Sequence, residues 1–129
     1  MNVYEEFIEI MKQNNLNKEA VIDVLNIYVN GRNFLQHLED FKNKEGERRE
    51  YNGVIYSDEY EQDDEEYFGQ NKVLFYSGDG DGDDDYDIVN YDELYQYLSA
   101  ACEFYIGKNS EKKEIIEELL MKIKGKYAY

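Results

Sequence analysis

The sequence predicts an α+β domain with three N-terminal helices, a small antiparallel sheet of two or three strands, and two C-terminal helices. Apolar residues recur at helical spacing in the N-terminal part of the chain and again after residue 90. Between these regions, short runs of β-branched and aromatic residues alternate with acidic segments. The 129 residues, of which 42% are hydrophobic, are expected to form a single domain over residues 1–129.

Three helices are expected in the N-terminal part. The apolar spacing of residues 3–13 predicts the first helix. The second, KEAVIDVLNIYVN, is expected to begin after Asn17 and to stop at Gly31, because asparagine caps helix starts and glycine favours helix ends. A third helix is expected to open at Asn33, and its apolar pattern ends at Gly46.

The middle of the chain changes to a strand pattern. Residues 51–57 (YNGVIYS) and 73–77 (VLFYS) are rich in β-branched and aromatic side chains, which predicts two strands. A short third strand is expected at residues 87–89. The acidic stretches 58–66 and 78–86 are then the connections between strands.

Two helices are expected to complete the domain. Asn90 is a suitable N-cap for the first, and Glu93 stands three positions later, as a capping box requires. This helix is expected to end at Gly107. Ser110 is expected to cap the last helix, EKKEIIEELLMKIK, and Gly125 to close it.

Acidic residues are concentrated in one part of the chain. The formal net charge is −16, and residues 58–93 contain fifteen acids and a single base, Lys72. Such a charge repels nucleic acids and anionic membranes, so neither is expected as a partner. It favours a cationic partner or simply high solubility.

The remaining composition favours a cytoplasmic protein. Cys102 is the only cysteine, so no intramolecular disulfide can form, as is usual in a reducing compartment. The N-terminus, MNVYEEFIEI, lacks the cationic start of a signal peptide. No apolar run approaches the roughly 18 residues that are typical of a membrane span.

The segment SGDGDGDDDYD, residues 77–87, contains six aspartates and invites comparison with a calcium-binding loop. An EF-hand loop needs glycine at position six and glutamate at position twelve. A register that starts at Asp81 places Tyr86 at position six, and a register from Ser77 places Ile88 at position twelve. No specific metal site is therefore predicted, although weak cation binding by so many carboxylates is expected.

Catalytic patterns are not found. His37 and Cys102 cannot supply the ligands of a usual zinc site, and Cys102 falls on the inward face of its helix. A Cys–His nucleophile pair therefore ranks below a buried, inert thiol. The sequence has no nucleophile elbow, phosphate-binding loop or dinucleotide fingerprint. We expect neither enzymatic activity nor a cofactor.

Tyrosine is unusually frequent, with fourteen residues in the chain. Those within the acidic part are Tyr60, Tyr67, Tyr76, Tyr86 and Tyr91. Some, such as Tyr76, are expected in the strand core with hydroxyls that reach water. Tyrosine among carboxylates also suits a partner rich in lysine and arginine, through ion pairs and cation–π contacts.

Two segments carry a resemblance to a known family. They are YNGVIYSDEYEQDDEEYFGQNKVLFY and, after the acidic turn, IVNYDELYQYLSAACEFYIG. Over residues 20–107 the chain resembles immunity proteins of contact-dependent growth inhibition (CDI), in particular the ribonuclease-toxin immunity group. The resemblance implies a cytoplasmic protein that binds the toxic C-terminal domain of a secreted effector and covers its active site or substrate path. It carries no binding residue across, because these residues differ between members.

The sequence therefore predicts an immunity protein that neutralises a cognate ribonuclease toxin through an acidic, tyrosine-rich surface covering a basic cleft. Alternatives are an acidic mimic of nucleic acid that inhibits a DNA- or RNA-binding protein, and a Ca²⁺-binding module. The predicted partner-binding residues come from the two acidic connections and are Asp58, Glu59, Tyr60, Glu61, Asp63, Asp64, Glu65, Glu66, Tyr67, Asp79, Asp81, Asp83, Asp84, Asp85, Tyr86 and Asp87.

Overall fold

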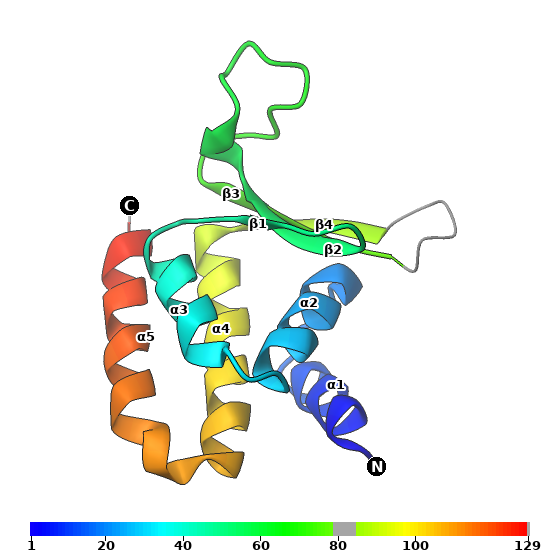
Figure 1. The fold of residues 1–129 in the computed structure, drawn as a ribbon. Helices are drawn as coiled ribbons and strands as arrows, with labels where there is room; N and C mark the ends of the chain where they lie inside the picture. Colours follow the sequence, from blue (N-terminus) through cyan, green and yellow to red (C-terminus); the bar gives the residue numbers. More distant parts are fainter. Residues whose placement is uncertain (79–84, 129) are drawn as a thin grey trace.

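A computed structural model describes residues 1–78 and 85–128, and these form a helical layer against one face of an antiparallel sheet (Figure 1). Five α-helices are present in this part of the chain: α1 (Val3–Gln13), α2 (Glu19–Val29), α3 (Phe34–Lys42), α4 (Tyr91–Lys108) and α5 (Lys113–Tyr127). The sheet has the order β1 (Glu47–Arg48), β2 (Asn52–Tyr56), β3 (Lys72–Ser77) and β4 (Asp85–Asn90). The predicted α+β class and the order of helices and strands are confirmed.

The sheet is larger than predicted, with four strands in the described residues instead of two or three. The additional strand, β1, consists only of Glu47 and Arg48, and these two charged residues carry no strand signal of their own. It forms because the chain after α3 runs back antiparallel to β2. β4 begins at Asp85, earlier than expected, so the final residues of the second acidic stretch belong to a strand.

The helix boundaries differ from the prediction at two glycines. Gly107 lies within α4 and Gly125 within α5, so neither ends its helix. A Cβ added at either position would meet no neighbour, and both glycines take helical dihedrals there at a cost of about 1 kcal/mol relative to alanine. Ser110 opens a short 3₁₀ turn, η2 (Ser110–Lys112), instead of capping α5.

The start of α4 was predicted in more detail. The Glu93 backbone N–H donates to Oδ1 of Asn90 at 2.8 Å, so Asn90 is the N-cap. The Glu93 carboxylate, however, pairs with Lys18 at 2.9 Å, which ties the start of α4 to the start of α2. The cap therefore serves tertiary packing as well as the helix itself.

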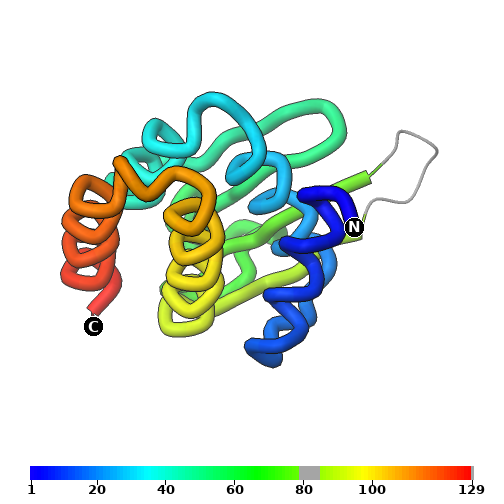
Figure 2. The backbone as a smooth tube through the Cα atoms, turned by 90° about the horizontal axis from the view of Figure 1, so that it is seen from below, coloured from blue at the N-terminus to red at the C-terminus, as the bar shows by residue number. Residues whose placement is uncertain are grey.

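The core lies between the sheet and the helices, which Figure 2 views with the helices in front of the sheet. Because successive side chains of a strand point to opposite faces, Val73 and Phe75 of β3 and Val89 of β4 point toward the helices and are fully buried. Their neighbours Leu74 and Ile88 point the other way and stay partly exposed. We call this second side the outer face of the sheet.

Three groups tie the end of β2 to the helical layer. The Tyr127 hydroxyl of α5 donates to the Phe41 carbonyl at 2.5 Å and is also hydrogen-bonded to the Tyr56 hydroxyl of β2. Burial raises the pKa of both tyrosines, so both hydroxyls stay protonated at neutral pH. These buried bonds fix the point from which the first acidic connection leaves the sheet. Among the described helices, none is long and apolar enough to cross a membrane.

Candidate functional site

The two acidic connections leave the sheet at opposite ends of β3. Residues 57–71, which we call the acidic lobe, join β2 to β3 and project away from the helices (Figure 1). The second connection starts after Ser77, at the other end of β3, about 20 Å from the beginning of that strand at the usual rise per residue. Four of the predicted binding residues, Asp79, Asp81, Asp83 and Asp84, lie outside the described residues.

The neck of the lobe is held by Glu59. Its carboxylate accepts a hydrogen bond from the Tyr56 backbone N–H at 2.7 Å and pairs with Nη2 of Arg48 at 3.1 Å. Arg48 also donates to the Tyr60 hydroxyl at 3.3 Å, and the Tyr60 ring meets Phe68 edge-on. Glu59 and Tyr60 therefore position the lobe, in addition to being part of its surface.

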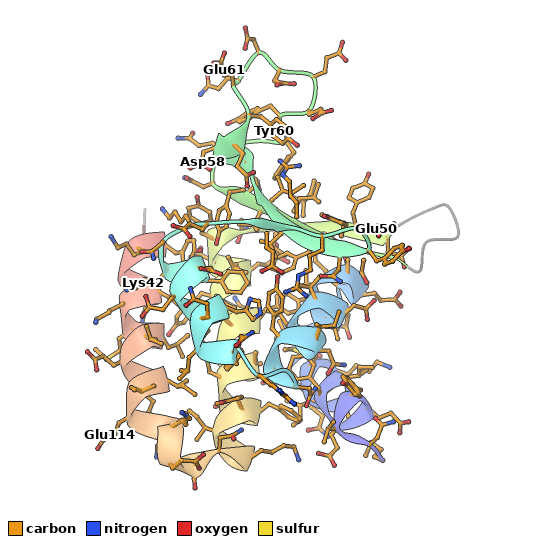
Figure 3. The ribbon with its side chains drawn as sticks, in the orientation of Figure 1. Lys42, Glu50, Asp58, Tyr60, Glu61 and Glu114 are labelled. Atoms are coloured by element: carbon orange, nitrogen blue, oxygen red, sulfur yellow. The ribbon has the colours of Figure 1, made fainter. Side chains whose placement is uncertain are left out.

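Beyond the neck, the lobe presents carboxylates without internal partners. Asp64 closes a turn, since its Oδ1 accepts from the Glu66 backbone N–H at 3.1 Å. Among the described residues, no salt bridge involves the remaining exposed acids of the lobe, and Figure 3 shows two of them, Asp58 and Glu61, on the projecting segment. These acids are Asp58, Glu61, Asp63, Glu65 and Glu66. Their charge is available to a partner.

A groove of about 650 Å³ runs along the base of the lobe. Its lining includes acids and tyrosines of the lobe, such as Asp58, Glu61 and Tyr67, together with Tyr91 at the start of α4. Among the described residues, Lys44 is the one cation on this lining, and its Nζ lies 4.8 Å from the centre of the Tyr91 ring. Carboxylates next to aromatic rings are suited to bind a lysine or arginine side chain.

The acids at the β4 end have a different role. Asp87 caps α2: its Oδ2 accepts from the Ala20 backbone N–H at 2.8 Å, and α2 has no capping side chain of its own. The Lys18 N–H is satisfied by the Tyr97 hydroxyl at 2.9 Å. Asp85 projects from the same side of β4 as Asp87, toward α2. Asp87, predicted as a partner contact, therefore stabilises the fold.

A further carboxylate, Asp23 of α2, joins this end of the sheet. Its pKa is raised by burial first, and then by the charges of Glu19, Asp85 and Asp87, while a hydrogen bond from Ser77 opposes the shift. Asp23 was not predicted as part of the site, because it lies on a helix far from β4 in sequence and the sequence gives no sign of their contact. Like-charge crowding at this end costs stability.

Two predicted tyrosines on the outer face differ in their roles. The Tyr76 ring lies over Gly53, and its hydroxyl donates to the Arg49 carbonyl at 2.6 Å and accepts from the Arg49 N–H at 3.0 Å. Its hydroxyl thus binds the backbone beside β1 at an exposed edge of the sheet. Tyr86, directly across from Tyr76 on β4, is 65% exposed and free for contact.

The side chains with catalytic or metal-binding potential lie outside the acidic lobe. His37, Asp40 and Glu47 offer ligand atoms within 4.8 Å of one another, but Glu47 is also paired with Arg49. Burial lowers the pKa of His37, and the nearby charge of Arg49 lowers it further, while the charges of Glu47 and Asp40 oppose the shift. The imidazole stacks on the ring of Tyr28. This cluster was missed because Glu47 belongs to the unpredicted strand β1.

Cys102 is buried in α4, as predicted. Burial raises the pKa of its thiol to about 12, so the thiolate needed for nucleophilic chemistry is scarcely populated at neutral pH. The Cys102 side chain packs in the hydrophobic core.

Comparisons with known proteins agree with the resemblance seen in the sequence. The model of the CDI immunity protein family matches residues 18–120. The fold is similar to the crystal structure of an immunity protein from Neisseria meningitidis MC58, with a TM-score of 0.64 and 17% identity over 95% of this chain and 98% of that one. No curated protein matches the sequence. Because the family match covers most of the chain, this protein belongs to the CDI immunity proteins.

Proposed function

We propose that this protein binds and neutralises the ribonuclease domain of a cognate toxin in the cytoplasm, by presenting its acidic lobe to a basic active-site cleft. The observation that carries the proposal is the set of lobe carboxylates without internal partners, beside a groove with tyrosine walls. Membership of the immunity family supplies the class of partner.

The chemistry of the partner explains the charge. A ribonuclease must hold phosphates, so its cleft is cationic, and an inhibitor has to satisfy the same cations. Steering by complementary charge raises association rates toward about 10⁸–10⁹ M⁻¹s⁻¹ at low salt. Close charge pairs in such complexes couple by about 1.5–7 kcal/mol. Rapid capture suits an antidote, because each free toxin molecule cleaves RNA until it is bound.

The structure narrows the set of residues proposed to make direct contact. Glu59 and Asp87 already serve as internal acceptors, so their removal affects the fold before it affects binding. The exposed acids of the lobe and Tyr67, on the wall of the groove, remain as contacts. A lysine or arginine of the toxin that enters this groove would meet carboxylates and an aromatic ring together.

The test requires the cognate effector, which is sought as a gene that ends immediately upstream in the producing strain, and it uses the C-terminal domain of that effector. A lobe variant, Glu61→Gln, Glu65→Gln, Glu66→Gln, is compared with a control variant, Glu111→Gln, Glu114→Gln, Glu117→Gln, which removes equal charge at the far end of the molecule (Figure 3 labels Glu61 and Glu114). We expect RNA cleavage by the toxin to be inhibited fully by the control variant and at least about tenfold less effectively by the lobe variant. Equal inhibition by both variants would refute the role of the lobe.

A further inference from the structure

The outer face of the sheet carries an apolar row that is buried at its β2 end, where Ile55 is 9% exposed, and partly open to solvent toward β4. Ile55, Leu74 and Ile88 are direct cross-strand neighbours on β2, β3 and β4. Leu74 and Ile88 are partly exposed, and every α-helix of the described residues lies on the opposite side (Figure 1). Tyr86 extends this surface with an exposed ring in the next row.

The edges of the same sheet are less available for strand addition. On β4, the Ile88 carbonyl accepts a hydrogen bond from Lys18 Nζ at 2.8 Å, and α2 packs beside the strand. At the other edge, β1 is only two residues long, and the Tyr76 hydroxyl occupies the Arg49 backbone groups. A partner therefore meets the face of the sheet more readily than its edge.

The charge around the outer face indicates what kind of partner binds there. The acidic lobe rises beside the outer face, on the same side of the sheet (Figure 1). A second copy of this chain would bring two molecules of net charge −16 together, which like-charge repulsion opposes. Two cations border this face: Arg48, on the adjoining strand, is already paired with Glu59, and Lys72 lies on the outer side of β3 next to the more numerous acids of the lobe. The surface thus combines an apolar centre with an anionic rim.

We propose that the outer face is the apolar half of the toxin interface. An apolar patch of the toxin packs against Tyr86, Leu74 and Ile88, and lysines and arginines around that patch pair with the acidic lobe. This inference rests on the proposed function. Apolar contact at the centre lengthens the life of the complex, whereas charge at the rim speeds its formation. The two halves are therefore separable by kinetics.

The experiment measures binding of the upstream-encoded toxin domain to Tyr86→Ala and to Ile88→Gln. The matched controls are Met121→Ala and Ile115→Gln, which alter exposed apolar residues of α5. We expect each outer-face variant to raise Kd at least about tenfold, chiefly through faster dissociation and with an unchanged salt dependence. Both controls are expected to bind like the unaltered protein. Tyr86 is exposed, so its substitution keeps the test valid if Ile88→Gln disturbs the fold.

The outcomes separate this inference from the proposed function. If the outer-face variants bind normally while the lobe variant is impaired, the inference is overturned and the proposed function stands. If the outer-face variants are impaired and the lobe variant is not, the apolar interface is supported and the role of the lobe is refuted. If the toxin domain does not bind the unaltered protein, both fail together.

Discussion

At the scale of single residues, the structure divides the carboxylates into those that hold the fold and those that face solvent. Asp87 and Glu59 each accept a backbone N–H, at 2.8 and 2.7 Å. Asp58 and Glu61, close to Glu59 in sequence, have no such partner among the described residues. Composition predicts the charge of this region but not this division, because the partners of Asp87 are 67 residues away in sequence.

Asp87→Ala tests the capping role. Loss of the acceptor for the Ala20 N–H is expected to lower the free energy of unfolding by about 1 kcal/mol, the usual cost of losing an N-cap. Chemical denaturation at neutral pH measures the change. Asp85→Ala, which removes a neighbouring exposed acid, serves as the control and is expected to have a smaller effect. Equal destabilisation by the two substitutions would argue against a cap at Asp87.

For Asp23, in contrast to Asp87, removal of the carboxylate is expected to stabilise the fold at neutral pH. Its pKa is raised in the folded state, above the ordinary value of 3.8, so the folded protein binds this proton more tightly than the unfolded chain. Ionisation therefore costs stability at neutral pH, and the cost disappears as the pH falls through the raised pKa. Asp23→Asn, which can still accept from Ser77, is expected to raise Tm at pH 7 and to leave it nearly unchanged near pH 3. A variant less stable than the parent at pH 7 would contradict this explanation.

Titration of His37 changes the stability of the fold in the opposite direction: acid destabilises it. Burial lowers its pKa below 6.5, so the unfolded chain binds the proton more tightly than the folded protein. Its contribution to stability is fully present above pH 6.5 and is lost as the pH falls through the window beneath that value. His37→Gln is expected to flatten the change of Tm between about pH 6.5 and 5. An identical pH profile for parent and variant would show that the imidazole stays solvated.

At the scale of elements, the sequence predicted correctly those helices whose apolar pattern extends over many residues. It failed for elements whose structure is determined by tertiary contacts. The helices α1, α2 and α4 have clear apolar spacing, and their positions were predicted closely. β1 was not predicted, because two charged residues acquire strand geometry only through pairing with β2. The glycines expected to end α4 and α5 lie inside these helices, since their exposed positions tolerate a missing side chain.

Tyr76 supports the pairing of β1 with β2, in addition to the bond from the Arg49 N–H to the Asn52 carbonyl at 3.0 Å. Its hydroxyl donates to and accepts from the Arg49 backbone, and its ring fills the space over Gly53, where an added Cβ would lie 2.5 Å from the ring. Tyr76→Phe keeps the ring and removes both bonds, with an expected loss of about 1–3 kcal/mol. Hydrogen exchange should show faster exchange of the Arg49 amide. Tyr86→Phe, on the neighbouring strand, is the control, and similar exchange in both variants would exclude this role for the Tyr76 hydroxyl.

At the scale of the whole molecule, the two acidic connections start from distant points of the sheet. They leave opposite ends of β3, whereas the sequence suggested a single acidic surface. Sequence order shows that both follow strands, but only the antiparallel order of β2, β3 and β4 separates them. A partner that contacts both the acidic lobe and Tyr86, near the start of β4, has to span the outer face, which connects charge at the rim to apolar contact at the centre.

The proposed function depends most on the attraction between the acidic lobe and a cationic toxin. Its most direct test is the association rate constant with the upstream-encoded toxin domain, measured by stopped flow from low salt to about 1 M, where the Debye length is about 3 Å. The unaltered protein and the Glu111, Glu114, Glu117→Gln control should both slow steeply with salt. The Glu61, Glu65, Glu66→Gln variant should start slower and depend less on salt. Association that is insensitive to salt in all three proteins would contradict the account.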